Sequence, residues 1–194
     1  MEIKKLVNNT LNFSINRLIE VIGITIAVIG LLLLISLLSY SPDDPNFIFP
    51  KNTNIENILG FRGSFVSDLF FQSLGLITLL IPFSLIFIGS NIFFKKEILL
   101  IVESLFYTIL YSLFGSLFFS SFYDNSFKLY INGNGGFIGK YLDSTFLHSL
   151  ININSQVSYY LLIIIITALF LITIKFKITF FYRFAKKLLT ILFL

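Results

Sequence analysis

The chain has 194 residues, of which 56% are hydrophobic and 12% charged, and its mean hydropathy is +0.91. These values fall outside the range of soluble globular domains and indicate an integral membrane protein. The chain has no cysteine and one histidine, which excludes disulfides, thiol catalysis and the usual zinc-hydrolase patterns. Its net charge of +4 is first of all a topology signal and poor evidence for nucleic-acid binding.

The first predicted membrane helix covers residues 21–40 and follows a polar N-terminal segment, residues 1–20. Its apolar part runs without a charge from Val21 to Leu38. Eighteen residues at 1.5 Å rise reach about 27 Å, close to the thickness of the hydrocarbon core of a bilayer. A cleaved signal peptide is the alternative, but the run is longer than the apolar region of such peptides and no small-residue cleavage site follows it. The pattern favours an uncleaved helix.

A rigid acidic turn ends this helix. Tyr40 is placed where an amphipathic ring prefers to lie, at the level of the lipid headgroups. Two prolines and two carboxylates then prevent further helix, and Asp43 and Asp44 would each cost about 2.5 to 3.5 kcal/mol at the bilayer centre. The helix is therefore predicted to end in water, at the acidic turn formed by Ser41, Pro42, Asp43, Asp44 and Pro45.

Two further membrane helices follow a polar connector at residues 41–68. Residues 69–94 carry no ionisable side chain and exceed the minimum span, which allows tilt or a kink at Pro82. The short basic turn at residues 95–97 only reverses the chain. The pattern predicts an antiparallel pair with a third helix over residues 98–122.

The last part of the chain contains a loop, a helix and a basic tail. Residues 124–156 are rich in Asn, Ser and Gly and are predicted to form turns. Residues 157–174 form the fourth predicted helix. Residues 175–194 are too short to span again and resemble a basic amphipathic segment at the membrane surface. The predicted fold is an all-α membrane protein, a bundle of four transmembrane helices within residues 21–174.

The distribution of basic residues predicts the orientation. The N-terminal segment, the tight turn and the tail hold ten of them: Lys4, Lys5, Arg17, Lys95, Lys96, Lys175, Lys177, Arg183, Lys186 and Lys187. The two longer loops hold four: Lys51, Arg62, Lys128 and Lys140. Because cytoplasmic segments carry the excess of Lys and Arg, both termini are predicted to lie in the cytoplasm.

Nucleotide-binding and metal-binding patterns are not found. A phosphate loop requires G-x-x-x-x-G-K-[ST], and the chain has a single Gly-Lys pair, Gly139-Lys140. Asn134 stands in place of the first glycine of the motif and Tyr141 in place of its hydroxyl residue. We expect His148 to be a solvated or packed loop residue. The sequence therefore predicts no catalytic, cofactor-binding or metal-binding residues.

Charged residues near the membrane have structural interpretations. Asp43 and Asp44 are expected to end the first helix rather than to form a catalytic pair. Glu103 is the one charge within an otherwise apolar span, where a carboxylate can have a transport or packing role. Its position near a helix end favours reaching toward the headgroups and toward Lys95 or Lys96.

The chain resembles a known family at the acidic turn and at several later positions. The run Ser39-Tyr40-Ser41-Pro42-Asp43-Asp44-Pro45 with Phe47 is similar to the start of the four-helix membrane domain of the FtsK/SpoIIIE family of bacterial DNA translocases. The resemblance covers nearly the whole chain. It includes Gly60, Gly63, Asp68, Gly75, Pro82, Gly135, Gly136 and Gly139.

The resemblance implies a function. Such a domain localises to the division septum in the bacterial inner membrane, contacts other division proteins and tethers a cytoplasmic motor that pumps chromosomal DNA. The family's motor is hexameric, so a homo-oligomer is one of the states that the resemblance allows. Because the chain ends at Leu194, without linker, motor or DNA-reading winged helix, we expect neither enzymatic activity nor direct nucleic-acid binding from it.

Two other classes of function stay open at this point. A small four-helix transporter or channel subunit would need polar groups along a path, and an intramembrane enzyme would need a nucleophile with its base. The predicted helices offer only Glu103, Gln72, Pro82 and scattered Ser and Thr. An anchoring bundle needs only apolar helices and exposed loops, with residues 41–45 as the candidate partner-binding turn.

Overall fold

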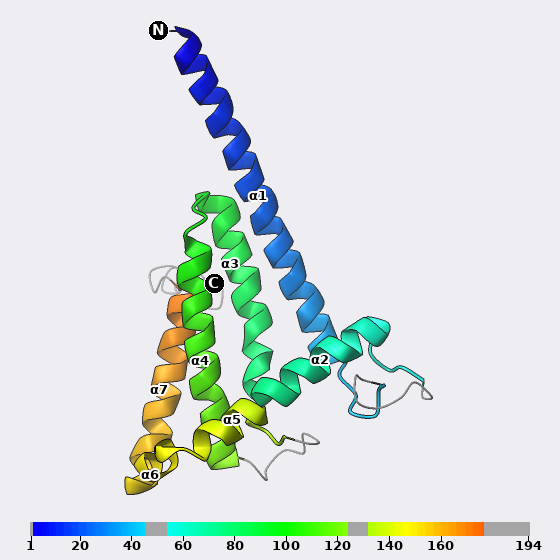
Figure 1. The fold of residues 1–194 in the computed structure, drawn as a ribbon, viewed down its shortest axis with the longest axis vertical. Coiled ribbons are helices and arrows are strands. Elements are labelled where there is room, and N and C mark those ends of the chain that lie inside the picture. The colour runs from blue at the N-terminus through cyan, green and yellow to red at the C-terminus, as the bar shows by residue number, and fades with distance from the viewer. Residues whose placement is uncertain (1, 46–53, 124–131, 177–194) are drawn as a thin grey trace, which may run out of the picture.

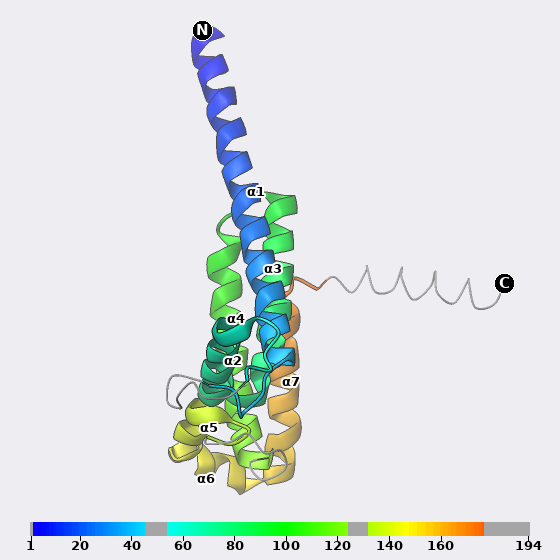
Figure 2. The same ribbon diagram turned by 90° about the vertical axis from the view of Figure 1, so that its right-hand side faces the viewer.

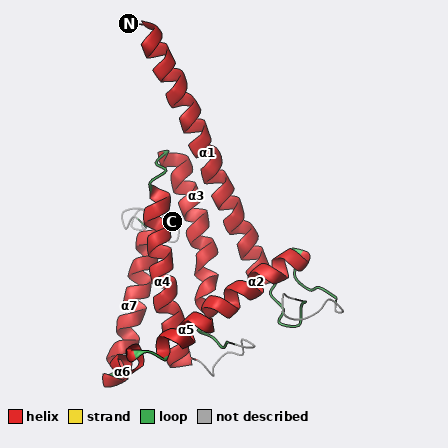
Figure 3. Cartoon of the chain, in the orientation of Figure 1, coloured by secondary structure: helices red, strands yellow, loops and turns green. Residues whose placement is uncertain are grey.

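The computed structural model describes residues 2–45, 54–123 and 132–176, and these residues form helices and connecting turns (Figures 1 and 3). The elements are α1 (Glu2–Leu38), α2 (Gly60–Leu74), the 3-10 helix η1 (Gly75–Leu80), α3 (Ile81–Lys95), α4 (Leu100–Tyr123), α5 (Gly136–Asp143), α6 (Phe146–Ile153) and α7 (Ser155–Thr173). Phe47 and the predicted amphipathic tail beyond Phe176 lie outside the described residues.

Four helical stretches among the described residues are long and apolar enough to cross a membrane. They are Asn8–Leu38, Gly60–Lys95, Leu100–Tyr123 and Ser155–Thr173. The prediction of an all-α membrane domain with four spanning helices is confirmed.

The long helices pack in a row. α1 packs along α3, α3 against α4, and α4 against α7 (Figure 1). α2 crosses obliquely at the end of α1, and α5 contacts both α2 and α4 at this end of the bundle. The N-terminal half of α1 extends beyond the α3–α4 turn in both views (Figures 1 and 2). The helix thus begins at Glu2, well before the apolar run.

Small residues allow the closest contact between α1 and α3. A methyl group on Gly89 would lie 2.4 Å from the carbonyl oxygen of Gly23, and one on Gly23 would lie 2.8 Å from the carbonyl oxygen of Gly89. Ala27 lines the same contact. Association of helices in lipid depends on such close backbone packing because apolar burial gives little driving force there.

Buried hydroxyl groups connect the next helices of the row. Ser84 of α3 and Tyr111 of α4 share a hydrogen bond of 2.8 Å, and both side chains are fully buried. Tyr123 of α4 and Tyr159 of α7 share another of 2.8 Å, within a cluster of aromatic rings. These polar side chains therefore hold helices together.

The second span differs from the predicted continuous helix over residues 69–94. Helix α2 begins at Gly60, and the chain bends at Gly75, where φ is +73°. Pro82 lies in the first turn of α3, where its missing N–H has no intrahelical partner to lose. The break is thus at Gly75, and Pro82 starts the following helix.

The region predicted as a turn-rich loop also contains helices. α5 and α6 occupy most of residues 136–153. Thr145 caps α6 by accepting a hydrogen bond from the Leu147 N–H at 3.3 Å, and Asn154 caps α7 by accepting one from Val157 at 3.1 Å. The Ser, Thr and Asn residues of this region therefore start helices as well as forming turns.

Candidate functional site

The acidic turn follows the end of α1 directly, and its five residues differ in exposure. Ser41 and Pro42 are half-buried, Asp43 is exposed, and Asp44 and Pro45 are buried. The Asp44 N–H donates to the Ser41 carbonyl at 3.3 Å and closes the turn. The structure thus separates two adjacent carboxylates, one facing outward and one facing inward.

Asp44 connects the turn to the far end of the connector. Its side chain is only 3% exposed, and its carboxylate accepts hydrogen bonds from the backbone N–H groups of Glu56 at 2.7 Å and Asn57 at 3.0 Å. Bonds to an ionised acceptor are the stronger kind of hydrogen bond. Asp44 therefore brings residues a dozen positions away back to the end of α1.

Asn57 then caps α1. Its side-chain amide donates to the carbonyl oxygens of Ser36 at 2.9 Å and Ser39 at 3.2 Å. The last carbonyls of a helix lack intrahelical donors, so these bonds satisfy groups that would otherwise be unpaired near the membrane. Gly63 is required beside Asn57, because a methyl group there would lie 2.1 Å from the Asn57 Oδ1 atom.

Tyr40 connects the same helix end to α2. Its hydroxyl donates to the Asp68 carboxylate at 3.3 Å, and its ring lies 4.7 Å from the ring of Phe71, centroid to centroid. Ser64 of α2 donates to the Pro45 carbonyl at 3.1 Å. The acidic turn is therefore fixed on both sides, to the end of α1 and to the start of α2.

A second contact site, the glycine junction, consists of Gly75, Gly135, Gly136 and Gly139. A methyl group on Gly75 would lie 1.9 Å from the Asn134 carbonyl oxygen, and one on Gly136 would lie 2.6 Å from the Gly75 nitrogen. Methyl groups on Gly135 and Gly139 would lie 2.6 Å and 2.3 Å from the Ser116 carbonyl oxygen. The loop backbone thus packs directly against the bend in the second span and against α4.

Hydrogen bonds across the glycine junction pair the backbone groups that the break in the second span leaves without helical partners. The Leu76 N–H donates to the Asn134 carbonyl at 2.9 Å, and the Ser116 hydroxyl donates to the Leu74 carbonyl at 2.8 Å. The side-chain amide of Asn132 donates to the Gln72 carbonyl at 3.2 Å. An interrupted membrane helix is tolerated only where other groups replace its lost bonds, and the junction supplies them.

The Gly-Lys pair tested for nucleotide binding lies within this junction. Gly139 is buried against Ser116, Lys140 is exposed, and both are inside helix α5. A phosphate loop instead wraps its ligand ahead of a helix. Gly139 thus packs against α4, and the Gly139-Lys140 pair does not form a phosphate loop.

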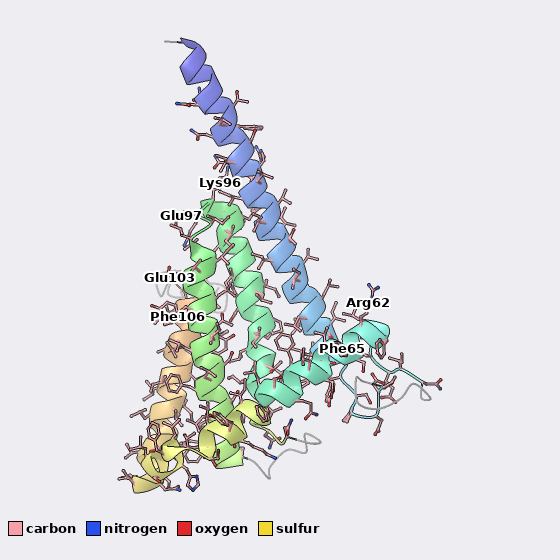
Figure 4. All side chains as sticks on the ribbon, viewed as in Figure 1. Arg62, Phe65, Lys96, Glu97, Glu103 and Phe106 are labelled. Atoms are coloured by element: carbon pink, nitrogen blue, oxygen red, sulfur yellow. The ribbon has the colours of Figure 1, made fainter. Side chains whose placement is uncertain are left out.

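Ion pairs lie toward the opposite end of the bundle (Figure 4). Lys96 in the tight turn pairs with Glu20 of α1 at 2.9 Å. Glu103 pairs with Lys175 at the end of α7. The expectation that Glu103 reaches toward Lys95 or Lys96 was wrong about the partner, because the neighbouring helix α7 ends beside Glu103 and places Lys175 there.

The remaining titratable groups give no cluster with metal-ligand character in the part of the chain that the structure describes. His148 is exposed and lies 3.3 Å from the Asp143 carboxylate. Asp44 is occupied by two backbone donors. Asp44 and Asn57 thus use their side chains to bond backbone groups at the end of α1 and in the connector.

An apolar groove of about 480 Å³ lies between α1, α2 and α3. Arg62 lies at its edge, on the outer side of α2 (Figure 4). The walls are aliphatic and aromatic side chains, among them Ile29, Leu32, Leu33, Val66, Phe70 and Leu85. Apart from Arg62 and Ser36, this lining offers no side-chain group suited to acid, base or nucleophile chemistry.

These features define a class: a multi-pass helical membrane domain whose polar side chains bond helix ends, breaks and neighbours. Comparison with known families gives the particular case. Residues 16–186 match the family described as the 4TM region of DNA translocase FtsK/SpoIIIE, and the chain belongs to this family.

Individual relatives carry the same name. The chain is 31% identical over 87 residues to the DNA translocase FtsK of Rickettsia prowazekii (strain Madrid E), covering 43% of this chain and 12% of the relative. It is 34% identical over 77 residues to the DNA translocase FtsK of Rickettsia bellii (strain RML369-C), covering 40% and 10%. The chain thus spans about a tenth of the length of these relatives. No solved structure matches it.

The residues of the resemblance that the structure describes lie mainly at the two contact sites. Asp44, Gly63 and Asp68 fix the acidic turn to the neighbouring helices. The glycine junction contains Gly75, Gly135, Gly136 and Gly139. Sequence reasoning found these positions through the family pattern but missed what each contacts, since most of the partners are a dozen or more residues away in the chain.

Proposed function

We propose that the chain is the membrane-anchoring, septum-localising domain of an FtsK-type DNA translocase that acts in cell division and chromosome segregation. Family membership, the names of the relatives and four apolar helices support this proposal. The DNA-pumping activity then belongs to a motor that this domain tethers. The domain itself holds that motor at the membrane, and the residues that the structure describes contain no cluster of metal ligands.

The proposed location is the bacterial inner membrane, with both termini in the cytoplasm. The distribution of basic residues supports this orientation. The ion pairs also support it, because Glu20 with Lys96 and Glu103 with Lys175 gather the end of the N-terminal segment, the tight turn and the end of α7 on one side. The acidic turn and the glycine junction then face the exterior.

The observation that carries the proposal is the difference in burial between the adjacent carboxylates of Asp43 and Asp44. Asp44 holds the turn from inside, while Asp43 is exposed. Pro42 and Pro45 fix two φ angles, so little entropy is lost when a partner binds. A helix stop alone needs no such construction. The partner-facing surface is therefore Ser41, Pro42 and Asp43, with other division proteins as the proposed partners.

Fluorescence microscopy of the tagged chain in dividing bacteria tests this proposal. We expect enrichment at midcell, and we expect Pro42→Gly combined with Asp43→Asn to lose most of that enrichment while membrane insertion is kept. The matched control is Glu97→Gln, an exposed acid at the opposite end of the bundle. Uniform membrane fluorescence of the unchanged chain would contradict septal localisation. Unchanged enrichment in the double variant would mean that the acidic turn only ends α1 and does not bind a partner.

A further inference from the structure

A second cavity lies where the end of α3 meets the end of α7. Its volume is about 330 Å³. Phe87, Asn91 and Phe94 of α3 share one face of that helix, as residues four and three apart do. Ile174, Lys175 and Phe176 close the other side. The cavity is on the side of the bundle that holds the tight turn and the Glu103 ion pair (Figure 4).

The polar groups of this cavity are held in place by the fold. The Asn91 side-chain amide donates to the Ile174 carbonyl at 3.4 Å and so joins α3 to α7. Lys175 is fixed by its ion pair with Glu103. Lys95 is exposed at the cavity rim and makes no ion pair with the described residues. Because the Glu103 carboxylate offsets one of the two ammonium groups, the cavity keeps a net positive charge.

The aromatic side chains around these groups are exposed. Phe87 is 45% exposed, Phe94 77% and Phe176 42%. Phe94 and Phe176 lie near the ends of apolar spanning helices, at the level where acyl chains give way to headgroups, and Phe87 lies about two turns deeper in α3. A ligand that fits must therefore present an anion to the lysines and an apolar chain to the rings.

We propose that this cavity binds one anionic glycerophospholipid. Its phosphate lies between Lys95 and Lys175, and its acyl chain lies along Phe87 and Phe94. Basic pockets between membrane helices on the cytoplasmic side suit such headgroups. A bound lipid would join α3 to α7 at the site where Asn91 already links them. This inference rests on the proposed orientation, which places this end of the bundle in the cytoplasm, and goes beyond the anchoring function.

Native mass spectrometry of the detergent-solubilised 194-residue chain tests the proposal. Phosphatidylglycerol and phosphatidylcholine with identical acyl chains are the lipid probes, and soluble glycerol phosphate is the third. We expect retained phosphatidylglycerol adducts, with about fivefold weaker binding in Lys95→Gln, the effect of one basic residue at an anionic lipid. The matched control is Lys140→Gln, an exposed lysine on α5 at the other end of the bundle.

Each outcome decides the matter. Preference for phosphatidylglycerol that Lys95→Gln weakens and Lys140→Gln leaves intact supports the proposal. Equal retention of both lipids, or equal loss in both variants, overturns it. Binding of glycerol phosphate as tight as that of phosphatidylglycerol also overturns it, because the rings would then add nothing. A second variant, Ser90→Leu, fills the cavity without changing charge and should also reduce adducts, whereas unchanged adducts would place the lipid elsewhere.

Discussion

Asp43 and Asp44 are adjacent and chemically identical, but they have different surroundings. Two backbone N–H groups from the far end of the connector bind the Asp44 carboxylate, while Asp43 is exposed. The same distinction holds for the hydroxyls, since Tyr111 is fully buried and bonded to Ser84 whereas Tyr160 is 58% exposed. At the scale of single residues, position in the fold decides whether a polar group stabilises the domain or faces outward.

Replacing Asp44 by alanine tests this distinction. We expect Asp44→Ala to destabilise the protein by about 2 to 4 kcal/mol, because the N–H groups of Glu56 and Asn57 lose a charged acceptor. Asp43→Ala should cost less than Asp44→Ala, because the Asp43 side chain is exposed to solvent. Thermal unfolding in detergent measures both. Equal losses would mean that Asp44 does not organise the connector.

Tyr111→Phe removes one buried hydroxyl between α3 and α4. Hydrogen bonds between membrane helices contribute about 0.6 kcal/mol on average and up to about 1.7 kcal/mol, so we expect a loss in that range. Tyr160→Phe, which changes an exposed tyrosine of α7, serves as the control and should be neutral. Denaturant unfolding in mixed micelles gives the difference. An unchanged free energy of unfolding in Tyr111→Phe would mean that the Ser84–Tyr111 hydrogen bond does not stabilise the contact between these helices.

At the scale of elements, the bend in the second span depends on a loop far along the chain. Gly75 begins η1 with φ of +73°, and the carbonyl of Asn134 occupies the space where a side chain would be. Ser116 of α4 bonds the Leu74 carbonyl at the same place. The oblique course of α2 is therefore a property of the glycine junction as a whole.

Gly60 and Gly75 have similar positive φ values but differ in how closely other atoms surround them. Gly60 has φ of +64° with no atom within 4 Å of its missing Cβ, whereas Gly75 has φ of +73° with an oxygen at 1.9 Å. Gly60→Ala should cost about 1 to 2 kcal/mol through the backbone alone. Gly75→Ala should cost about 1 to 3 kcal/mol more through crowding. Unfolding measurements of the two variants should differ by this amount, and equal values would argue against a packed junction.

The spanning elements could be predicted from sequence because uncharged apolar runs of sufficient length are a local property. The structure places α4 at Leu100–Tyr123 and α7 at Ser155–Thr173, close to the predicted residues 98–122 and 157–174. The bend at Gly75 could not be predicted, because a glycine within an apolar run gives no sign of the loop that packs against it.

The partners of the candidate site were equally hidden in the sequence. The roles of Asp44 and Glu103 depend on groups 12 and 72 residues away. Local spacing suggested Lys95 or Lys96 for Glu103, and only the return of α7 brings Lys175 beside it. The family pattern marked the acidic turn as a whole but could not separate its inward carboxylate from its outward one.

At the scale of the whole molecule, the two ends of the bundle differ. The acidic turn and the glycine junction, with their backbone hydrogen bonds, lie at one end together with α2 and α5. The ion pairs of Lys96 and Lys175 lie toward the other. This polarity is what an anchor needs if it recognises partners outside the cell and holds a motor inside it. We therefore expect the two ends to face opposite sides of the membrane.

Labelling of single introduced cysteines tests this sidedness, since the chain has no cysteine of its own. Cysteines introduced as Asp43→Cys and Tyr141→Cys report on the end with the acidic turn, and Glu97→Cys reports on the tight turn; all three positions are exposed. In spheroplasts, a membrane-impermeant maleimide should label the first two, and should label Glu97→Cys only after permeabilisation. Labelling of Asp43→Cys and Glu97→Cys from the same side, or the reverse sidedness, would rule out the proposed orientation.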